Sequence, residues 1–513
     1  MLKFIGIMFV MGLAYTQAPL HYSNQNQYLL HGFALAGEGH LNEDWLANTT
    51  DPTPVFTWMV ALTTRFLPDW VFHIEYVVLF AIYAIAFLGV FQFLNGSDTK
   101  RFWTFAALAL LLHSALIRWA SYRWLGADYP WYFQSGVAGQ YILGATLQPS
   151  AFGVLLFLSI VLFLREQYTG AVVSLVLGVV MHATYLLPAA LLTLGYLRVL
   201  YNEGRTREAV RLGVTTFLFV LPVVIYVYTM FSGSGPKQHG AAQWTLVHVR
   251  IPHHSIPKLW CDPIAIAQIV WILIALVLAR GTRLFTVMWI GFSLAALFTI
   301  MVAITDNDSL ALLFPWRIST VFVPLSTAII MSKLVRTLPL WLNISFIVAL
   351  MIAGTLLMVY RQGYQVNEDE KPLLEFVKSN AASGQTYLIP VSIPDLEAKT
   401  YGSLSSDFKP IARKKADSRV IPYDLQRFRL TTGVGIYVDF KSVPYRDVEV
   451  SEWHSRLHRA VKWQQRLRDG DAVNVIPELR EKGITHIVVT ADVVIGGDVK
   501  EVYADTMYRV YEL

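Results

Sequence analysis

The sequence predicts an α-helical polytopic membrane domain followed by a small α/β domain, and two observations lead to this fold class. Hydrophobic residues make up 55% of the 513-residue chain and charged residues only 15%, whereas a soluble protein carries roughly a quarter charged residues. The long apolar runs are confined to residues 1–360, while residues 361–513 have the composition of a soluble protein. We therefore expect a membrane domain over 1–360 and a polar domain over 361–513.

Apolar runs recur through the first domain, each near the roughly 20 residues that cross the hydrocarbon core of a bilayer. We place about eleven spans at residues 3–20, 70–94, 102–119, 149–164, 169–182, 184–200, 212–231, 263–279, 284–304, 311–332 and 338–360. The stretch 169–200 is divided because it contains Pro188 and exceeds one crossing. The alternative for the first run, which starts at Lys3, is a cleaved signal peptide ending near Ala18.

Positive charges are distributed unequally between the loops on the two sides of these spans. With a cytoplasmic N-terminus, the short inner segments hold Lys3, Lys100, Arg101, Arg165, Arg198, Arg205, Arg207, Arg211, Arg280, Arg283, Lys333 and Arg336. The longer outer loops hold only Arg65, Arg118, Arg123, Lys237, Arg250, Lys258 and Arg317. Because cytoplasmic loops are enriched in Lys and Arg, the pattern predicts a cytoplasmic N-terminus and, with an odd number of spans, an extracytoplasmic C-terminal domain. The loop arginines also explain the net charge of +5, so we expect no nucleic-acid partner.

The first outer loop, residues 21–69, combines two helical segments with a pair of adjacent carboxylates. Residues 28–36 have helical apolar spacing that Gly37 ends, and residues 54–67 form an amphipathic piece too short to span. Glu43 and Asp44 lie between these segments. Two interfacial helices around this turn would hold the carboxylates at the membrane surface, beside lipid head groups.

This arrangement resembles the GT-C superfamily of glycosyltransferases, which use polyprenyl-phosphate sugars as donors. Members have many spans, a first outer loop with two interfacial helices, a short acidic motif near the first helix and often an extracytoplasmic C-terminal domain. The segment NEDW, which holds Glu43 and Asp44, and the Asp51-Pro52 step match this pattern. The segments NQNQY, RIPHH, FPWRIS and TGVGIYVDFKSVPY also resemble a bacterial branch of the superfamily, without specifying its activity.

The resemblance implies an inverting glycosyltransferase in which Glu43 or Asp44 is the catalytic base. A carboxylate would take the proton of the acceptor hydroxyl as its oxygen attacks the anomeric carbon. One acid of the pair could instead bind a divalent metal ion, Mg²⁺ or Mn²⁺, and no set of protein ligands in the sequence identifies such a cofactor site. A solvated turn with a helix N-cap is the structural alternative.

Cations on the same outer side are candidates for binding the donor phosphate, because guanidinium and ammonium groups match phosphate oxygens. The loop 232–262 contains Arg250, His253, His254 and Lys258, and Arg317 lies just inside the outer end of a span. An ionisable group at that depth is costly and is therefore a functional candidate. The alternatives are a histidine metal site, an arginine that reaches the head groups, and an ordinary polar loop.

Other polar side chains on the outer side are candidates for contacts with the sugar or the acceptor. Sugar hydroxyls bind amides and sugar rings stack on aromatic faces, and the Gly- and amide-rich segment 128–150 offers both. These candidates are Asn26, Asp51, Gln140, Gln148 and His182. A loop packed for structural reasons, or a buried histidine in the core, is the alternative.

Residues 364–513 alternate helical and strand patterns. Helices are expected at 371–380 and 452–468, and strands at 386–390, 435–440, 485–490 and 508–513, which predicts a small α/β domain. Arg427, Arg429, Asp439 and Lys441 are close in sequence, and we expect salt bridges within this domain, with contact to an acceptor as the alternative. The single cysteine, Cys261, excludes an intramolecular disulfide.

These patterns favour a multi-pass glycosyltransferase of a bacterial inner membrane. It would move a sugar from a polyprenyl-phosphate donor to a glycan, lipid or protein acceptor on the periplasmic face, in contact with membrane lipid. One alternative is a lipid-linked glycan polymerase or ligase, which would depend more on Arg317 and His253 than on the acidic pair. The other is a non-enzymatic transporter or assembly protein; the absence of an internal repeat in the sequence argues against a transporter.

Overall fold

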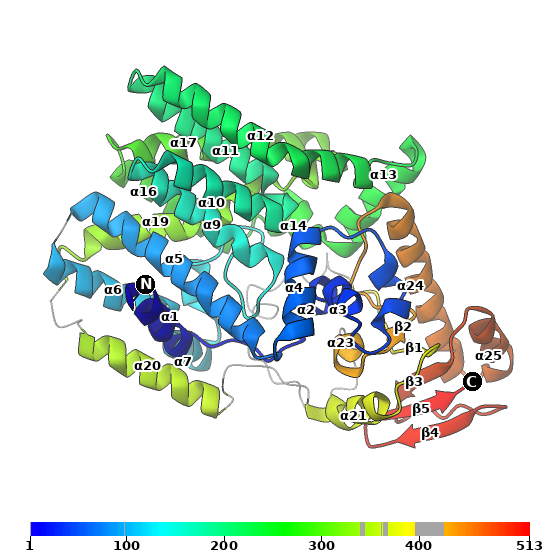
Figure 1. Ribbon diagram of the computed structural model, residues 1–513. Coiled ribbons are helices and arrows are strands. Elements are labelled where there is room, and N and C mark those ends of the chain that lie inside the picture. Colours follow the sequence, from blue (N-terminus) through cyan, green and yellow to red (C-terminus); the bar gives the residue numbers. More distant parts are fainter. Residues whose placement is uncertain (1, 97, 339–343, 361, 363–367, 395–424) are drawn as a thin grey trace.

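The computed structural model describes residues 2–96, 98–338, 344–360, 362, 368–394 and 425–513. Apolar helices pack side by side in its larger part, and a mixed sheet with helices forms the smaller C-terminal part (Figure 1). Short helices of the first outer loop lie between the two (Figure 1). The structure therefore has the helical, membrane-type fold that the composition predicts, with an additional α/β domain.

An apolar helix, or a pair of helices, lies within each range in which a span is predicted. These helices are α1 (Leu2–Ala14), α5 (Val71–Asn95), α6 (Thr99–His113) with α7 (Ala115–Leu125), η3 (Pro149–Gly153) with α9 (Val154–Leu164), α10 (Tyr168–Met181), η4 (Ala183–Tyr185) with α11 (Leu186–Asn202), α12 (Thr206–Phe231), α16 (Pro263–Leu278), α17 (Arg283–Thr305), α18 (Asp308–Ala311) with η6 (Pro315–Ile318) and α19 (Ser319–Leu334), and α20 (Ile344–Val359). Most of the predicted positions are thus helical, but residues 15–20 and 312–314 are not, and residues 339–343 of the last predicted span lie outside the described residues.

Helix length sets how many of these elements can cross a membrane unaided. Five stretches in the described chain are long and apolar enough, namely Val71–Asn95, Ala183–Asn202, Thr206–Phe231, Arg283–Thr305 and Asp308–Leu334. The pair α6 and α7 makes a sixth if its 50° bend lies within one span. The 13 residues of α1 extend about 20 Å, less than the roughly 30 Å hydrocarbon core. The count of about eleven spans therefore stays a prediction.

Loops on the predicted inner side contact one another. Arg283 bonds Glu203 at 2.6 Å, which joins the loops before α17 and after α11. Arg336 donates to the side chain of Asn95 at 2.9 Å and joins the ends of α19 and α5. The structure therefore gathers at one end of the bundle the loops that the positive-inside pattern groups together.

The first outer loop folds as its sequence predicts. It contains α2 (Gln25–Tyr28), α3 (Leu30–Ala36), η1 (Leu41–Glu43), η2 (Leu46–Asn48) and α4 (Pro54–Phe66). Gly37 ends α3 in the left-handed conformation, with φ +83°. A Cβ on Gly32 would lie 2.5 Å from the side chain of Val60, so a glycine is needed where α3 packs on α4. The two helices thereby fix the turn that carries the acidic pair.

The remaining outer loops are also built from short helices. They are α8 (Tyr129–Tyr132), α13 (Pro236–Trp244), the π-helical η5 (Thr245–Arg250), α14 (Pro252–Ser255) and α15 (Pro257–Trp260). Gly136 in the amide-rich loop packs directly on the start of α19, since a Cβ there would lie 2.5 Å from Ser319 Oγ. These loops form a folded layer over the outer end of the bundle.

The C-terminal part is a five-stranded mixed sheet in the order β2-β1-β3-β5-β4. Its elements are η7 (Glu368–Glu370), α21 (Lys371–Ser379), β1 (Thr386–Leu388), α23 (Phe428–Thr432), β2 (Gly435–Ile436), α24 (Asp447–Arg468), α25 (Ala472–Glu481), β3 (His486–Thr490), β4 (Lys500–Ala504) and β5 (Tyr508–Glu512). Strand β1 is parallel to β2 and β3, and β5 is antiparallel to β3 and β4. The predicted α/β character is confirmed, while β2 is shorter than predicted and β4 was not predicted.

The C-terminal domain shares its core with the outer loops. Ala242 of α13 and Leu246 of η5 belong to the same buried cluster as Trp453 of α24. Leu430 of α23 belongs to the main core of the apolar helices. Burying these side chains stabilises the contact by roughly 1.5–3 kcal/mol for each large side chain, so the domain is packed onto the outer layer.

Candidate functional site

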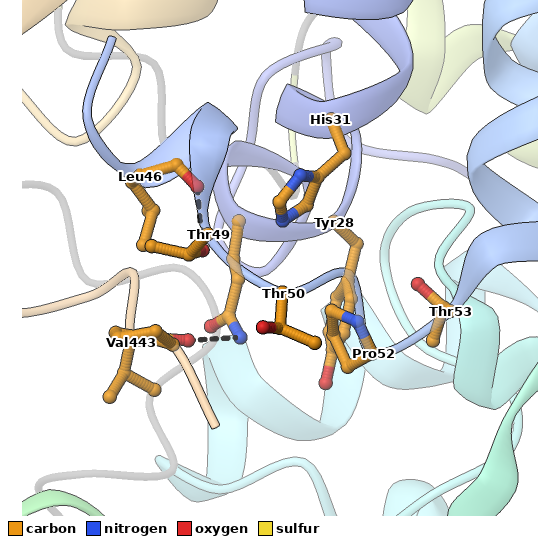
Figure 2. A pocket seen from close by; sticks show the side chains of 10 residues that line it. Tyr28, His31, Leu46, Thr49, Thr50, Pro52, Thr53 and Val443 are labelled. Atoms are coloured by element: carbon orange, nitrogen blue, oxygen red, sulfur yellow. Dashed lines mark hydrogen bonds between the residues drawn. The ribbon is translucent and has the colours of Figure 1, made fainter. Parts of the chain in front are cut away.

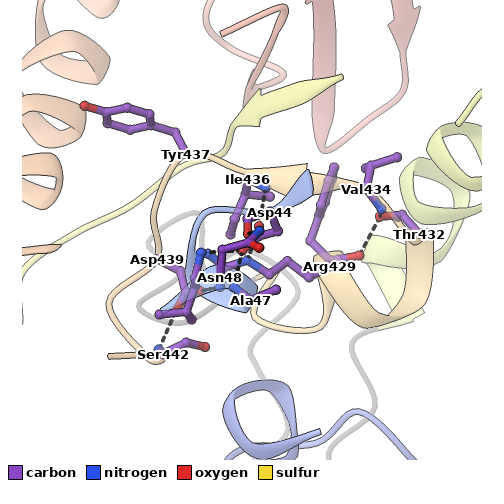
Figure 3. Close-up of polar contacts among 12 residues, drawn as sticks. Asp44, Ala47, Asn48, Arg429, Thr432, Val434, Ile436, Tyr437, Asp439 and Ser442 are labelled. Atoms are coloured by element: carbon purple, nitrogen blue, oxygen red, sulfur yellow. Dashed lines mark hydrogen bonds and ion pairs between the residues drawn. The ribbon is translucent and has the colours of Figure 1, made fainter. Parts of the chain in front are cut away.

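Asp44 is the centre of a buried polar network that joins the first outer loop to the C-terminal domain (Figure 3). Its Oδ2 accepts hydrogen bonds from Arg429 Nε at 2.8 Å and the Ile436 amide at 3.0 Å. Its other oxygen accepts from the amides of Leu46 at 2.8 Å and Ala47 at 3.3 Å. Protein donors therefore surround the Asp44 carboxylate on both oxygens.

Arg429 carries the network into the α/β domain. Its Nη1 donates to Asp439, and Asp439 Oδ1 accepts from the Ser442 amide at 2.6 Å. The side chains of Arg429 and Asp44 are 3% and 0% exposed, so their charges are compensated almost entirely by one another and by Asp439. The expectation of salt bridges within this segment is confirmed, and the Asp44 connection is an addition to it.

Glu43 has a different environment, although it is the next residue. Its side chain is exposed, and it accepts hydrogen bonds from Ser383 Oγ at 2.6 Å and the Gly384 amide at 2.7 Å. The Ser383 hydroxyl, and then the Gly384 amide, hold the pKa of Glu43 below its usual value. The acidic pair therefore faces the C-terminal domain through both of its members.

Cations from three parts of the chain form a second feature, which we call the basic cluster: Arg250, His253, His254, Arg317 and Lys441. Arg250 Nη2 donates to the Lys441 carbonyl, and its guanidinium lies 5.5 Å from the centroid of the Phe440 ring. His253 and His254 have ring centroids 4.0 Å apart, and His254 Nδ1 lies against the Ala138 carbonyl. The Arg317 guanidinium lies 5.1 Å from the centroid of the Tyr185 ring. Apart from Lys441, these residues were predicted as phosphate ligands.

Several donors of the basic cluster are buried without a hydrogen-bond partner in the described part of the chain. They are Arg250 Nε, Arg317 Nε and His253 Nδ1. Neither arginine forms an ion pair with a carboxylate of the described residues. Because an unpaired buried charge costs several kcal/mol, the two guanidinium groups would gain most from an anion with several oxygen atoms.

Electrostatics within the basic cluster keep its histidines neutral. Burial, and then the charges of Arg317, Arg250 and Lys441, lower the pKa of His254 to about 4, against the opposing effect of the Ala138 carbonyl. Burial, and then His254, Arg250 and Lys441, lower the pKa of His253 well below its usual value. Burial and the Arg250 guanidinium lower the pKa of Lys441 to about 7, with Asp439 opposing the shift. The two arginines therefore carry the permanent positive charge.

Four of the predicted sugar or acceptor contacts are buried in the outer layer. Gln140 Oε1 and Asn26 Oδ1 are buried without a hydrogen-bond partner among the described residues. Gln148 bonds the Tyr141 side chain, whose hydroxyl lies in the field of Arg317. The His182 ring centroid lies 5.9 Å from that of Tyr28. Gln140 and Asn26 therefore each offer a side-chain oxygen that could accept a hydrogen bond from a hydroxyl group.

Two predicted residues lie elsewhere. Lys258 is 66% exposed and its nearest carboxylate is Asp306, 3.9 Å away, so the structure does not bring it to the buried cations. Asp51 caps the chain before α4, where its side chain accepts from the Thr53 amide at 2.8 Å. Its carbonyl accepts from the Tyr226 hydroxyl, which ties the first outer loop to α12.

A small pocket of about 10 Å³ lies between the first outer loop and the segment that follows Lys441 (Figure 2). Its lining comes from the first outer loop and from the segment that follows Lys441, and consists of Gln27, Tyr28, His31, Leu46, Thr49, Thr50, Pro52, Thr53, Val443 and Pro444. Tyr28 links the pocket to the cluster, because its hydroxyl lies in the field of both Arg317 and Arg250. The Gln27 amide donates to Tyr445 at 2.8 Å and closes the wall between the two segments.

His31 was not singled out in the sequence, and Lys441 was singled out but not as part of a phosphate site. His31 is one histidine in an apolar helical segment, and Lys441 was assigned to salt bridges of the C-terminal domain. The signal for His31 was its place in the outer loop next to the acidic turn. For Lys441 there was no signal, since its neighbour Arg250 is 191 residues away.

Metal ligands do not cluster in the described residues, where no group of three or more His, Cys, Asp and Glu side chains could hold an ion. The carboxylate of Asp44 is occupied by Arg429 and three backbone amides. Glu43 alone would be a poor Mg²⁺ or Mn²⁺ site, because these ions take several oxygen ligands. The requirement for a divalent metal ion stays open.

Comparisons with known proteins give one family match. Residues 412–460 match the domain of unknown function DUF6798. The matched segment includes Arg429, Asp439 and Lys441, so it contains the C-terminal side of both the Asp44 network and the basic cluster. A comparison of the whole chain with curated proteins gave no match.

Proposed function

We propose that this chain is a membrane glycosyltransferase of GT-C type that transfers a sugar from a polyprenyl-phosphate donor to a hydroxyl acceptor. One observation carries the proposal: Arg250, Arg317 and His253 each bury an unpartnered nitrogen within the described structure. A phosphate group presents several charged oxygens, and guanidinium groups bind such oxygens through strong, charge-assisted hydrogen bonds.

The position of Arg317 supports a lipid-linked phosphate. It lies in the apolar stretch Asp308–Leu334, one of the five long enough to cross a membrane. A charged group at such a depth is a functional candidate by default. A polyprenyl chain in the bilayer would bring its phosphate to the depth of Arg317. A water-soluble nucleotide sugar would have to be desolvated to reach the same depth.

The proposal includes the predicted topology. About eleven spans, a cytoplasmic N-terminus and a periplasmic C-terminal domain would place the basic cluster at the periplasmic face of a bacterial inner membrane. The acceptor, a glycan, lipid or protein, would reach the pocket from that side. The grouping of the loops at the two ends of the bundle supports this arrangement.

The acidic pair has a divided role in this proposal. Asp44 holds the first outer loop against Arg429 and is fully hydrogen-bonded, so it positions the loop. Glu43 is exposed and is the carboxylate of the pair that remains accessible. The first outer loop supplies the proton acceptor, and the Glu43→Gln variant tests whether Glu43 is that group.

A lipid-linked glycan polymerase or ligase is the second candidate. The same observation on Asp44 favours it, because this activity would depend less on the acidic pair and more on Arg317 and His253. Its donor would be a polyprenyl diphosphate that carries an oligosaccharide, and its product would be a longer glycan chain.

The test compares cells that carry wild type, Arg317→Ala or Arg250→Ala with Arg65→Ala at matched membrane levels. Arg65 is an exposed arginine of the same outer side and serves as the control. We expect both cluster variants, and not the control, to lose one glycan and to accumulate its lipid-linked donor. Accumulated polyprenyl monophosphate sugar supports the glycosyltransferase, and accumulated polyprenyl diphosphate oligosaccharide supports the polymerase or ligase. Unchanged lipids and glycans in both cluster variants would overturn both proposals.

A further inference from the structure

One hydrogen bond fixes the ring of His31 at the edge of this small pocket. Its Nδ1 lies 3.1 Å from the carbonyl oxygen of Ala47. A carbonyl oxygen only accepts hydrogen bonds, so Nδ1 carries the hydrogen in this contact. In the neutral ring the lone pair is then on Nε2. Nε2 has no partner among the described residues, and the ring points toward Thr50 in the pocket (Figure 2).

Asp44 determines where the Ala47 carbonyl lies. Its Oδ1 accepts from the amides of Leu46 and Ala47 and thereby holds η2 in place. Arg429 holds Asp44 from the other side. A continuous series of contacts therefore runs from Arg429 through Asp44 and Ala47 to His31, in which each group orients the next.

The pocket offers hydroxyl and amide groups next to this lone pair. Thr49, Thr50, Thr53 and Gln27 line it together with His31. The pocket's free volume of about 10 Å³ has room for about one hydroxyl group, so only the reacting hydroxyl of a sugar or similar acceptor would enter it. Tyr28 lies between this pocket and the arginines of the basic cluster, so an acceptor in the pocket would adjoin a phosphate held by the cluster.

We infer that His31 Nε2 is the group that takes the proton from the acceptor hydroxyl, and that Asp44 is a positioning residue that orients His31 through Ala47. This inference rests on the proposed glycosyl transfer. As the acceptor O–H bond breaks, its proton passes to Nε2 and its oxygen forms a bond to the anomeric carbon. The bond from that carbon to the phosphate oxygen breaks at the same time, and its electron pair leaves with polyprenyl phosphate. The imidazolium then returns its proton to water.

Glu43 and Glu449 are less suited to this role. Glu43 is bonded to Ser383 and Gly384 and does not line the pocket. Glu449 accepts from the amide and hydroxyl of Thr50 at 2.9 and 2.8 Å, so it positions a lining residue from behind. His31 is the imidazole that lines the pocket, beside the phenol of Tyr28.

The experiment uses membrane vesicles from cells that produce the full chain, which retain the native acceptor. Radiolabelled polyprenyl-phosphate glucose, mannose and galactose are the probes, and release of polyprenyl phosphate is measured. A general base contributes on the order of 100- to 10,000-fold. We expect His31→Gln to lower kcat by at least about 100-fold with donor KM changed by less than about threefold, whereas His40→Gln, the control in the same loop, keeps activity.

Further variants separate a catalytic role from a structural one. Added imidazole should restore turnover to His31→Ala and should not restore it to Arg317→Ala. Asp44→Asn should lower kcat and should not respond to imidazole. Two results would overturn the role of His31, provided that wild type turns over a donor. One is a His31→Gln variant that is as active as wild type, and the other is a His31→Ala variant whose turnover does not respond to imidazole. If Glu43→Gln or Glu449→Gln loses turnover while His31→Gln keeps it, the substituted acid is the base. If wild type turns over none of the three donors, the proposed function itself fails.

Discussion

At the scale of single residues, two adjacent carboxylates in the same turn have different physical roles. Asp44 accepts four hydrogen bonds, one of them from a guanidinium, and its burial is possible only because of them. Glu43 stays exposed and bonds a surface loop. The difference arises because η1 ends between them, which turns one side chain inward and the other outward.

Removing the charge of Asp44 should destabilise the protein strongly. Arg429 would be left buried with one of its two carboxylates missing, and breaking a buried ion pair costs about 3–5 kcal/mol. We expect Asp44→Asn to lower the thermal unfolding temperature of the purified protein in detergent, and Glu43→Gln to change it little. A double variant Asp44→Asn with Arg429→Gln should recover part of the loss. Equal unfolding temperatures for wild type and Asp44→Asn would contradict a structural role of the network.

Lys441 predicts a pH dependence of anion binding. Its pKa of about 7 means that it loses its charge as pH rises above neutrality, and a bound phosphate would favour the charged form. We expect the affinity for polyprenyl phosphate to fall between about pH 6.5 and 8.5 in wild type relative to Lys441→Arg, which stays charged. The ratio of the two affinities cancels the titration of the lipid phosphate. A constant ratio would remove Lys441 from the anion site.

The same pKa fixes the sign of a stability effect. Between about pH 7 and the ordinary lysine value of 10.5, the unfolded chain binds more protons at this residue than the folded chain. The free energy of unfolding contributed by Lys441 therefore rises with pH through this window. Thermal unfolding of wild type and Lys441→Met at pH 7 and 9 measures the contribution, since the variant lacks the titrating group.

The sequence identified some of these residues and could not identify others. Arg317 and Arg250 stand out because charge is rare in an apolar chain, and both have buried, unpartnered nitrogens. The contact of Asp44 with Arg429 spans 385 residues, and nothing local to either residue encodes it. His31 gains its role only when the Ala47 carbonyl fixes the hydrogen on Nδ1. Long-range contacts therefore set the parts of the candidate site that the sequence did not predict.

At the scale of elements, the first outer loop is held against α23 by backbone contact at two glycines. A Cβ on Gly39 would lie 2.6 Å from the Gly433 carbonyl oxygen, and the His40 amide donates to that oxygen at 2.7 Å. The two backbone segments thus approach more closely than a residue with a side chain would allow at Gly39. This contact lies beside the Asp44 network, and both hold the first outer loop against the C-terminal domain.

Two glycines of this turn provide a matched comparison. Gly37 and Gly39 both have positive φ, +83° and +53°, but a Cβ on Gly37 would meet open space. We expect Gly37→Ala to cost about 1–2 kcal/mol through backbone strain alone, and Gly39→Ala to cost more because it also separates the loop from Gly433. Thermal unfolding and limited proteolysis of the turn measure the difference. Equal effects of the two substitutions would show that the contact contributes nothing.

Periodicity located the elements well and their lengths less well. The helices α3, α4, α21 and α24 lie where apolar spacing predicts them, because one face of each packs on a neighbour. Strand β4 escaped prediction because its residues are mostly exposed at the sheet edge, so no buried alternation marks it. The bend between α6 and α7 arises where Ser114 caps α7 by accepting from the Ile117 amide at 3.3 Å, inside a stretch that hydropathy alone treats as continuous.

At the scale of the whole molecule, the structure arranges the loops in two groups at opposite ends of the bundle. Inner loops are joined by pairs such as Arg283 with Glu203. Outer loops form a layer that the C-terminal domain covers. Hydropathy and the charge pattern predicted this grouping without any knowledge of contacts, whereas the number of crossings depends on helix lengths that hydropathy does not determine.

The native cysteine gives a direct test of orientation. Cys261 is exposed in an outer loop, and the predicted topology places it in the periplasm. We expect a membrane-impermeant maleimide to label it in intact spheroplasts. In a Cys261→Ser background, Gly470→Cys should be labelled in the same way, and Arg280→Cys only after the membrane is permeabilised. The reverse pattern would place the C-terminal domain in the cytoplasm and would sink the proposed periplasmic reaction.

The bond between Asp44 and Arg429 also has a consequence for biosynthesis. At roughly 5–20 residues per second, the ribosome needs about 20–80 s to add the 385 residues that separate the two partners. During that interval Asp44 has emerged from the ribosome and Arg429 has not been synthesised. The outer layer can therefore close only after Arg429 has reached the same side of the membrane. A chain truncated before Arg429 would keep Asp44 unpaired in a loop that cannot dock. We expect quality-control proteases to cleave such an undocked loop.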